Sequence, residues 1–327
     1  MKHPLAACAS CIALLGVVLL PGCQAAGSTN QTSPAASIAG RSEASRDPSA
    51  TPPADQPPAE DPALRLTPPA DGRITIAVVL APDAEVVDFA GPWGVFEYAN
   101  IPNLDKNPFE LFTVAESTAP VRCSGGLTIV PDHTFANAPN ARIILIPAMG
   151  EPSPALLNWV REACQRTDLT MSVCNGSFVL AKAGLLAGKT VTSHHGGYGL
   201  LAATYPDVTV KRGARFVDDG RISTAGGLTS GIDLALHIVE RYYGRAAAEQ
   251  TSLDLEYQGT GWKDPNSNAM FAAAPVSTDD RPVCPICEMA VDKVSALSEV
   301  YKGRTVYFCG KSCQEAFGNA PDKFVKP

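Results

Sequence analysis

The sequence predicts an α/β protein with a mostly parallel sheet, followed by a small α+β C-terminal domain that a metal stabilises. Two observations predict this organisation. Between residues 73 and 258, continuous apolar runs rich in β-branched residues alternate with stretches of helical pattern, which is typical of strands buried on both faces. Between residues 282 and 327, the chain is near the size that needs a metal or disulfides to fold, and it carries four cysteines in two close pairs.

The expected elements of the central domain alternate along the chain. Strands are predicted at 74–80, 111–115, 142–146 and 170–173. Helices are predicted at 89–98, 154–166, 177–187, 230–243 and 245–257. Pro154 suits a first helical turn, and Gly188 suits a helix end. In a parallel sheet of this kind, ligands bind at the edge where the strands end.

Cys174 falls at that edge. The strand predicted at 170–173 runs directly into Cys174-Asn175-Gly176, and a helix follows. An abrupt strand-to-helix turn raises its central residue above the sheet, as in a nucleophile elbow, and Gly176 permits the tight turn. We expect the free amides of the helix to lower the thiol pKa and to hold an oxyanion. An inert buried cysteine is the alternative.

Composition narrows the classes of partner. The chain has 327 residues, enough for two domains of roughly 100–200 residues each. Its formal net charge is −7, and it has no run rich in Lys and Arg. We therefore expect no nucleic-acid partner.

The N-terminus is predicted to be a signal peptide at 1–22, because Lys2 precedes an apolar segment that is short for a membrane span. Its end, Leu20-Pro21-Gly22-Cys23, resembles a bacterial lipobox, which implies acylation of Cys23 and a membrane-anchored lipoprotein facing the periplasm or cell exterior. An ordinary signal peptide or an uncleaved anchor are the alternatives. The Pro-rich residues 23–72 are predicted to form a disordered tether.

Four blocks of the central domain resemble PfpI-type proteins, most closely the isonitrile hydratases and the sensor halves of AraC-type regulators. The blocks are Val86–Phe96, Ser172–Gly188, Thr192–His195 and Ala225–Leu236. The resemblance implies a flavodoxin-like three-layer sandwich, often dimeric, with Cys174 as nucleophile and Asp88 beside its sulfur. A carboxyl group there can steady a thiolate or shuttle a proton. Its position alone, just before a helix, would make Asp88 an N-cap.

Further positions complete the predicted site. His194 ends a predicted short strand and is a candidate orienter or base, with a surface histidine as the alternative; His195 is a weaker candidate. Asn175 stands where hydratase relatives often have Thr, and its backbone amide remains a candidate oxyanion donor. Ala148 and Met149 stand where relatives usually have glycines, so their amides are candidate donors in a narrower pocket.

Other residues are assigned no catalytic role. Glutamine amidotransferases pair their cysteine with His-x-Glu, whereas His237 and Glu240 are spaced one residue too wide and lie within a predicted helix, so we reject glutaminase activity. Cys123 and Cys164 are predicted to be structural. A Cys123–Cys174 disulfide is a redox alternative in an oxidising compartment.

The C-terminal module follows a polar connector at 259–281. Its four cysteines are Cys284, Cys287, Cys309 and Cys313, in the pattern C-x2-C and C-x3-C. Two close pairs of thiolates suit a tetrahedral soft metal such as zinc. Two structural disulfides are the alternative. Cys313 lies near a predicted helix start, which favours its thiolate.

This module resembles a YHS domain, a relative of the TRASH metal-binding modules. The resemblance rests on Cys287-x-Met289-x-Val291, on Tyr307-Phe308-Cys309 with Cys313, and on Pro321-Asp322-Lys323-Phe324. Cys284 is additional to the commonest YHS pattern, and Cys-Pro-x-Cys-x-Met is similar to the copper-handling NosL lipoproteins. Copper(I) is therefore the alternative metal.

Two function hypotheses follow. In the first, Cys174 attacks a small electrophile such as an isonitrile, aldehyde or acyl compound, and the central domain needs no cofactor. In the second, the chain is a non-catalytic sensor or metal-trafficking protein whose central domain binds a small ligand.

Overall fold

The computed structural model describes residues 64–324, which belong to one compact unit. The predicted signal peptide, Cys23 and most of the tether lie outside the described residues. Within 64–324, none of the helices has the length and apolar character required to cross a membrane.

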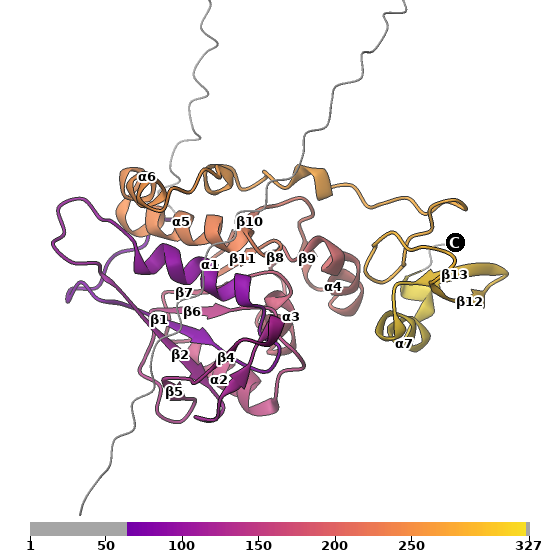
Figure 1. The fold of residues 1–327 in the computed structure, drawn as a ribbon, viewed down its shortest axis with the longest axis horizontal. Coiled ribbons are helices and arrows are strands. Elements are labelled where there is room, and N and C mark those ends of the chain that lie inside the picture. The colour runs from indigo at the N-terminus through magenta and orange to yellow at the C-terminus, as the bar shows by residue number, and fades with distance from the viewer. Residues whose placement is uncertain (1–63, 325–327) are drawn as a thin grey trace, which may run out of the picture. The chain divides into compact units, whose positions relative to one another are not determined.

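The central domain is built on a seven-stranded sheet of order β10-β11-β7-β6-β1-β2-β5 (Figure 1). Its strands are β1 (Ile74–Val79), β2 (Phe109–Ala115), β5 (His133–Thr134), β6 (Ile143–Ile146), β7 (Leu169–Ser172), β10 (Phe216–Asp219) and β11 (Ile222–Ala225). Strand β10 is antiparallel to β11, and the other pairings are parallel. The mostly parallel sheet is therefore confirmed, with an antiparallel edge that the sequence did not indicate.

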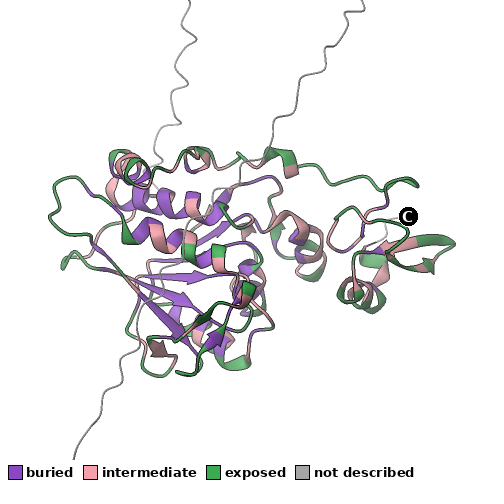
Figure 2. Cartoon of the chain, viewed as in Figure 1, coloured by how far each residue is buried: buried purple, intermediate pink, exposed green. Residues whose placement is uncertain are grey.

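Helices cover both faces of this sheet and make three layers (Figure 1). They are α1 (Val86–Glu97), α2 (Pro154–Ala163), α3 (Gly176–Lys182), α4 (Tyr198–Thr204), α5 (Ser230–Tyr243) and α6 (Arg245–Asp254). Strand β1 supplies Ile76 and Val78 to a core shared with α1, α5 and α6, and Ala77 and Val79 to a core shared with α2, α3 and α4. The alternation of side chains along a strand explains why both faces are apolar, and Figure 2 shows the buried residues concentrated in the sheet.

Helix α3 is shorter than the predicted 177–187. Gly184 has φ +76°, and the Leu185 amide donates to the Leu180 carbonyl at 3.0 Å. A left-handed glycine with this bond ends a helix in the manner of a Schellman motif. The first glycine of the stretch, and not Gly188, therefore stops the helix.

Segments expected to be connectors pack against the central domain. The Leu66 amide donates to the Arg241 carbonyl at 2.8 Å, so the end of the predicted tether is fixed to α5. In the 259–281 connector, Trp262 is 2 % exposed, and the Arg215 amide donates to the Pro265 carbonyl at 2.7 Å. Two short ribbons, β3 (Val121–Arg122) with β4 (Thr128–Ile129) and β8 (Thr190–Val191) with β9 (Thr209–Val210), lie outside the main sheet.

The C-terminal module consists of the hairpin β12 (Leu297–Tyr301) and β13 (Arg304–Phe308) and the helix α7 (Lys311–Asn319). Its buried core is four residues, Cys284, Ile286, Phe308 and Phe317. Most of the module is exposed or half-buried (Figure 2), so apolar burial alone gives it little stability.

Candidate functional site

Cys174 lies on a strained elbow between β7 and α3. Its φ is +57°, a left-handed conformation that residues other than glycine seldom adopt. The Cys174 amide donates to the Gly226 carbonyl at 2.9 Å, and the Val173 amide donates to the Ile146 carbonyl at 3.0 Å. The ends of β11 and β6 therefore fix the elbow, as the predicted position at the strand ends required.

Gly176 allows the turn for a steric reason. A Cβ at this position would lie 2.3 Å from the Ile146 carbonyl oxygen and 2.9 Å from that of Pro147. Both obstacles are backbone atoms that cannot rotate away. Glycine is the one residue that lets α3 start this close to the end of β6.

Asp88 is the third residue of α1 and is fully buried, so it is not the N-cap, which is Glu85. Its Oδ2 accepts a hydrogen bond from the Ala148 amide at 2.9 Å. Its Oδ1 is buried and has no hydrogen bond of regular geometry within the described residues. Burial raises the pKa of Asp88 to about 7, and interaction with the Cys174 side chain partly opposes that rise. The carboxyl group therefore titrates near neutral pH beside the sulfur.

The Cys174 thiol is only 7 % exposed. Burial, and next the charge of Asp88, raise the pKa of Cys174 to about 12, although the Asn175 and Leu228 amides donate to the sulfur and act in the opposite direction. The expectation of a lowered thiol pKa is therefore wrong, because desolvation outweighs two amide donors. At neutral pH the thiol keeps its proton, while the adjacent Asp88 carboxyl is partly ionised.

Leu228 is a member of this site that sequence reasoning missed. It lies within the matching block at 225–236, has φ +43°, and donates its amide to the sulfur. Its side chain is 37 % exposed and gives no chemical signal. A backbone donor of this kind is visible only once the fold is known.

His194 lies near the elbow without a hydrogen bond to Cys174 or Asp88 within the described part of the chain. Its Nδ1 accepts from the Gly196 amide at 3.1 Å, and burial lowers its pKa. Its ring packs on Gly227, where a Cβ would lie 2.5 Å from Cδ2. The neutral ring can shape the pocket wall, and its catalytic role stays a prediction.

The three residues predicted to donate amides to an oxyanion make different contacts in the structure. The Ala148 amide is taken by Asp88, so it does not face a substrate. Met149 packs its half-buried side chain between both cores of the sheet. The Asn175 backbone amide donates to the Cys174 sulfur, and the side-chain Oδ1 of Asn175 accepts from the Ser193 hydroxyl at 3.2 Å.

The remaining candidates have structural contacts. His237 binds Asp218 at 2.8 Å through Nε2, and the rejection of glutaminase activity stays a prediction. The described cysteines are all unpaired, so the structure contains no Cys123–Cys174 disulfide, and Cys164 accepts from the Thr170 hydroxyl at 3.0 Å. A cavity of about 280 Å³ lies over β10 and α5 and does not include Cys174, so cavity size does not identify the reactive centre.

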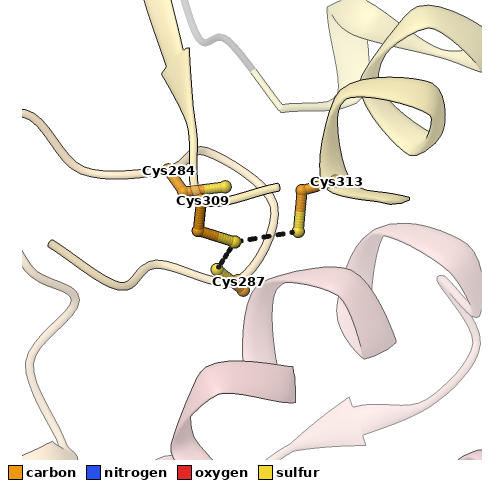
Figure 3. A group of neighbouring side chains, drawn as sticks. All are labelled: Cys284, Cys287, Cys309 and Cys313. Carbon is orange, nitrogen blue, oxygen red and sulfur yellow. Dashed lines mark hydrogen bonds between the residues drawn. The ribbon is translucent and has the colours of Figure 1, made fainter. Parts of the chain in front are cut away.

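The four cysteines of the C-terminal module converge, with their sulfurs within 4.8 Å of one another (Figure 3). The Cys287 and Cys309 sulfurs are 3.3 Å apart, and the Cys309 and Cys313 sulfurs are 3.4 Å apart. These separations exceed the S–S bond of about 2.05 Å. They approach the spacing of about 3.8 Å that four Zn–S bonds of about 2.3 Å produce in a tetrahedron. The cluster fits a metal ion better than disulfides.

The electrostatics of this cluster favour one thiolate in particular. The Cys287 side chain and the amides of Cys287, Cys309 and Ile286 lower the pKa of Cys284 to about 4. Burial raises the pKa of Cys313 to about 12, although Cys313 is in the first turn of α7. In the metal-free cluster the pKa shift of Cys313 therefore runs opposite to the expectation, whereas that of Cys284 favours a thiolate.

Comparison with known proteins gives matches to the central domain. Residues 74–241 match the DJ-1/PfpI family. The isonitrile hydratase of Pseudomonas putida is 33 % identical over 189 residues, which cover 56 % of this chain and 78 % of that protein. The HTH-type transcriptional regulator CdhR of Pseudomonas aeruginosa is 33 % identical over 138 residues, 41 % of this chain and 40 % of the regulator.

A crystal structure of a ThiJ/PfpI family protein from Pseudomonas syringae superimposes with a TM-score of 0.51 at 29 % identity, covering 57 % of this chain and 76 % of that one. The match to the family spans about half of the chain, including the elbow and Asp88. A chain with this sheet, this elbow and this match is a member of the DJ-1/PfpI family.

Proposed function

We propose that the chain is a cysteine-dependent hydratase or hydrolase of small neutral electrophiles, joined to a metal-binding module. The observation that carries the catalytic part is the buried carboxyl group of Asp88 beside the Cys174 sulfur at a left-handed elbow. The isonitrile hydratase relative makes isonitriles the first substrate class to test.

In the proposed reaction, the Cys174 sulfur bonds to the terminal carbon of the isonitrile while its proton passes to Asp88 and then to that carbon. The product of this step is a thioimidate. Water adds to the same carbon, the C–S bond breaks, and the sulfur regains a proton. The leaving product is an N-substituted formamide, so the net change is the addition of one water molecule.

The chain's own groups determine how this reaction depends on pH. Because the thiol is protonated at neutral pH, attack requires a base, and Asp88 is a base only above its pKa of about 7. The amides of Asn175 and Leu228 stabilise the negative charge that develops on the sulfur. We expect kcat/KM to rise as the pH passes through about 7.

The test is formamide production from a panel of small isonitriles, with glyoxals and amides as further substrates. Cys174→Ala and Asp88→Asn are expected to abolish turnover. Cys164→Ala is the matched control, because Cys164 is also buried but lies in the core on the α2 and α3 face. Undiminished turnover by Cys174→Ala would contradict the proposal.

A non-catalytic sensor is the second candidate. It is favoured by the low exposure of Cys174 and by the similarity to the regulator CdhR. This hypothesis predicts saturable binding of a small molecule without product formation. The resemblance to PfpI-type proteins also implies a homodimer. The absence of a nucleic-acid partner stays a prediction, which a mobility-shift assay with duplex DNA tests.

For the C-terminal module we propose a YHS-type zinc site made by Cys284, Cys287, Cys309 and Cys313, with copper(I) as the alternative metal. The convergence of the four sulfurs supports it. Metal analysis of the reduced protein is expected to give one equivalent of zinc, and Cys309→Ser is expected to lose it. One equivalent of copper(I) and no zinc would select the alternative.

We also propose that the protein is exported and attached to a membrane through acylated Cys23. This proposal depends on the lipobox resemblance alone, since Cys23 lies outside the described residues. Cys23→Ala is expected to move the protein from the membrane fraction to the soluble fraction of the cell envelope. A wild-type protein without a lipid on mass spectrometry would refute it.

A further inference from the structure

The metal loop Cys284–Met289 lies directly against the segment His194–Leu200 of the central domain. A Cβ at Gly199 would lie 2.9 Å from Oε1 of Glu288, and one at Gly196 would lie 3.5 Å from the Cys287 carbonyl oxygen. Leu200 packs against the small core of the module. The C-terminal module and the central domain are therefore joined by direct contacts as well as by the connector at 259–281.

A half-buried ion pair holds this contact. Arg212 Nη2 lies 2.6 Å from Glu288 Oε2, and the two side chains are 25 % and 20 % exposed. The guanidinium of Arg212 also lies 4.9 Å from the centre of the Tyr198 ring, and Tyr198 is 1 % exposed. Glu288, which lies between Cys287 and Met289, is thus linked through Arg212 to Tyr198, the first residue of α4.

The same segment reaches the cysteine elbow at its other end. The Gly196 amide donates to His194 Nδ1 at 3.1 Å, and the His194 ring packs on Gly227. The next residue, Leu228, donates its amide to the Cys174 sulfur. Contacts therefore run from Cys287 through Gly196, His194 and the 227–228 turn to Cys174.

We propose that metal binding by the four cysteines controls access to Cys174 through the segment His194–Leu200. With metal bound, the Cys284–Met289 loop is fixed and Glu288 holds α4 and His194 against the 227–228 turn. Without metal, a module with so small a core loses this order, and the wall beside Cys174 opens. This inference rests on the proposed metal site and does not require that the chain be an enzyme.

The experiment measures the rate at which iodoacetamide alkylates Cys174 in the full chain, by mass spectrometry of the peptide that contains it. Zinc-loaded protein is compared with reduced, metal-free protein. Zinc is expected to slow alkylation of Cys174 by at least about fivefold, the lower end of usual couplings between sites. Zinc affinity is measured separately by competition with a chelating dye.

Three variants separate the causes. Cys309→Ser is expected to lose the effect of zinc, which excludes direct binding of zinc at Cys174. Glu288→Gln is expected to bind zinc and yet lose most of the protection of Cys174. Lys302→Met is the matched control, because its exposed ion pair with Asp322 lies within the module, and both zinc binding and protection are expected to persist.

The outcomes are distinguishable. A wild-type chain that binds zinc tightly while its Cys174 rate stays unchanged would overturn the coupling and leave the metal site standing. A chain that binds no zinc would overturn both. Equal loss of protection in Glu288→Gln and Lys302→Met would show that the ion pair with Arg212 is not the link.

Discussion

Replacing Asp88 by Asn tests the electrostatic basis of the site, because it removes the charge and nearly preserves the shape. The amide oxygen of the introduced side chain can still accept from the Ala148 amide. Burial raises the pKa of Asp88 from 3.8 to about 7 in the folded protein. The folded state therefore binds this proton more tightly than the unfolded state does, and the stability that it contributes is full below about pH 4 and lost as the pH rises through about 7.

The magnitude follows from the shift. About three pH units at 1.36 kcal/mol each correspond to about 4 kcal/mol in total, of which about 2.6 kcal/mol falls between pH 5 and 8. The assay is urea unfolding of the wild type and of Asp88→Asn at pH 5, 6, 7 and 8. We expect the wild type to lose stability relative to the variant by this amount. The exposed Glu97 of the same helix provides the control variant Glu97→Gln, which should run parallel to the wild type.

A second measurement on the same variant addresses the thiol. The charge of Asp88 is the second cause of the raised pKa of Cys174, so its removal increases the fraction of thiolate. Alkylation needs the thiolate but, unlike isonitrile hydration, no proton transferred by Asp88 to the electrophile, so we expect Asp88→Asn to speed alkylation of Cys174 at pH 8 although it abolishes turnover. Unfolding free energies that differ by a constant from pH 5 to 8, together with an unchanged alkylation rate, would refute the placement of an ionisable Asp88 beside the sulfur.

Two further predictions concern stability. Gly176→Ala forces a Cβ to 2.3 Å from a backbone oxygen and is expected to cost about 3 kcal/mol, which lowers the melting temperature by about 10 °C. The control is Gly94→Ala at a helical position whose Cβ would meet no atom of another segment within 4 Å; it should stabilise the protein by up to about 1 kcal/mol, and equal effects of the two variants would contradict the steric argument. Arg215→Met removes the cationic partner of buried Asp233, which lies 2.6 Å away, and leaves it the Tyr257 hydroxyl as a donor; we expect a cost of about 3–5 kcal/mol in urea unfolding. Adding Asp233→Asn should recover part of the loss, and no recovery would show that the uncompensated charge is not the cause.

Hydrophobic pattern alone predicted much of the fold. The apolar runs at 74–80 and 142–146 are central strands β1 and β6, because a strand buried on both faces needs an unbroken apolar sequence. The helix at 230–243 has the predicted bounds. The strands β10 and β11 were missed, since their residues include Asp218, Ser223 and Thr224, whose polar side chains are buried among partners distant in sequence.

The sequence by itself determined the alternation of strands and helices, the elbow cysteine and the four-cysteine pattern, because each depends on residues that are neighbours in the chain. Only the tertiary structure decided the ionisation of the site. Asp88, Ala148, Cys174 and Leu228 come from four separate segments, and their pKa values depend on the burial and amide donors that meet when those segments pack. Local sequence carries no measure of desolvation, which here exceeds the effect of the helix amides.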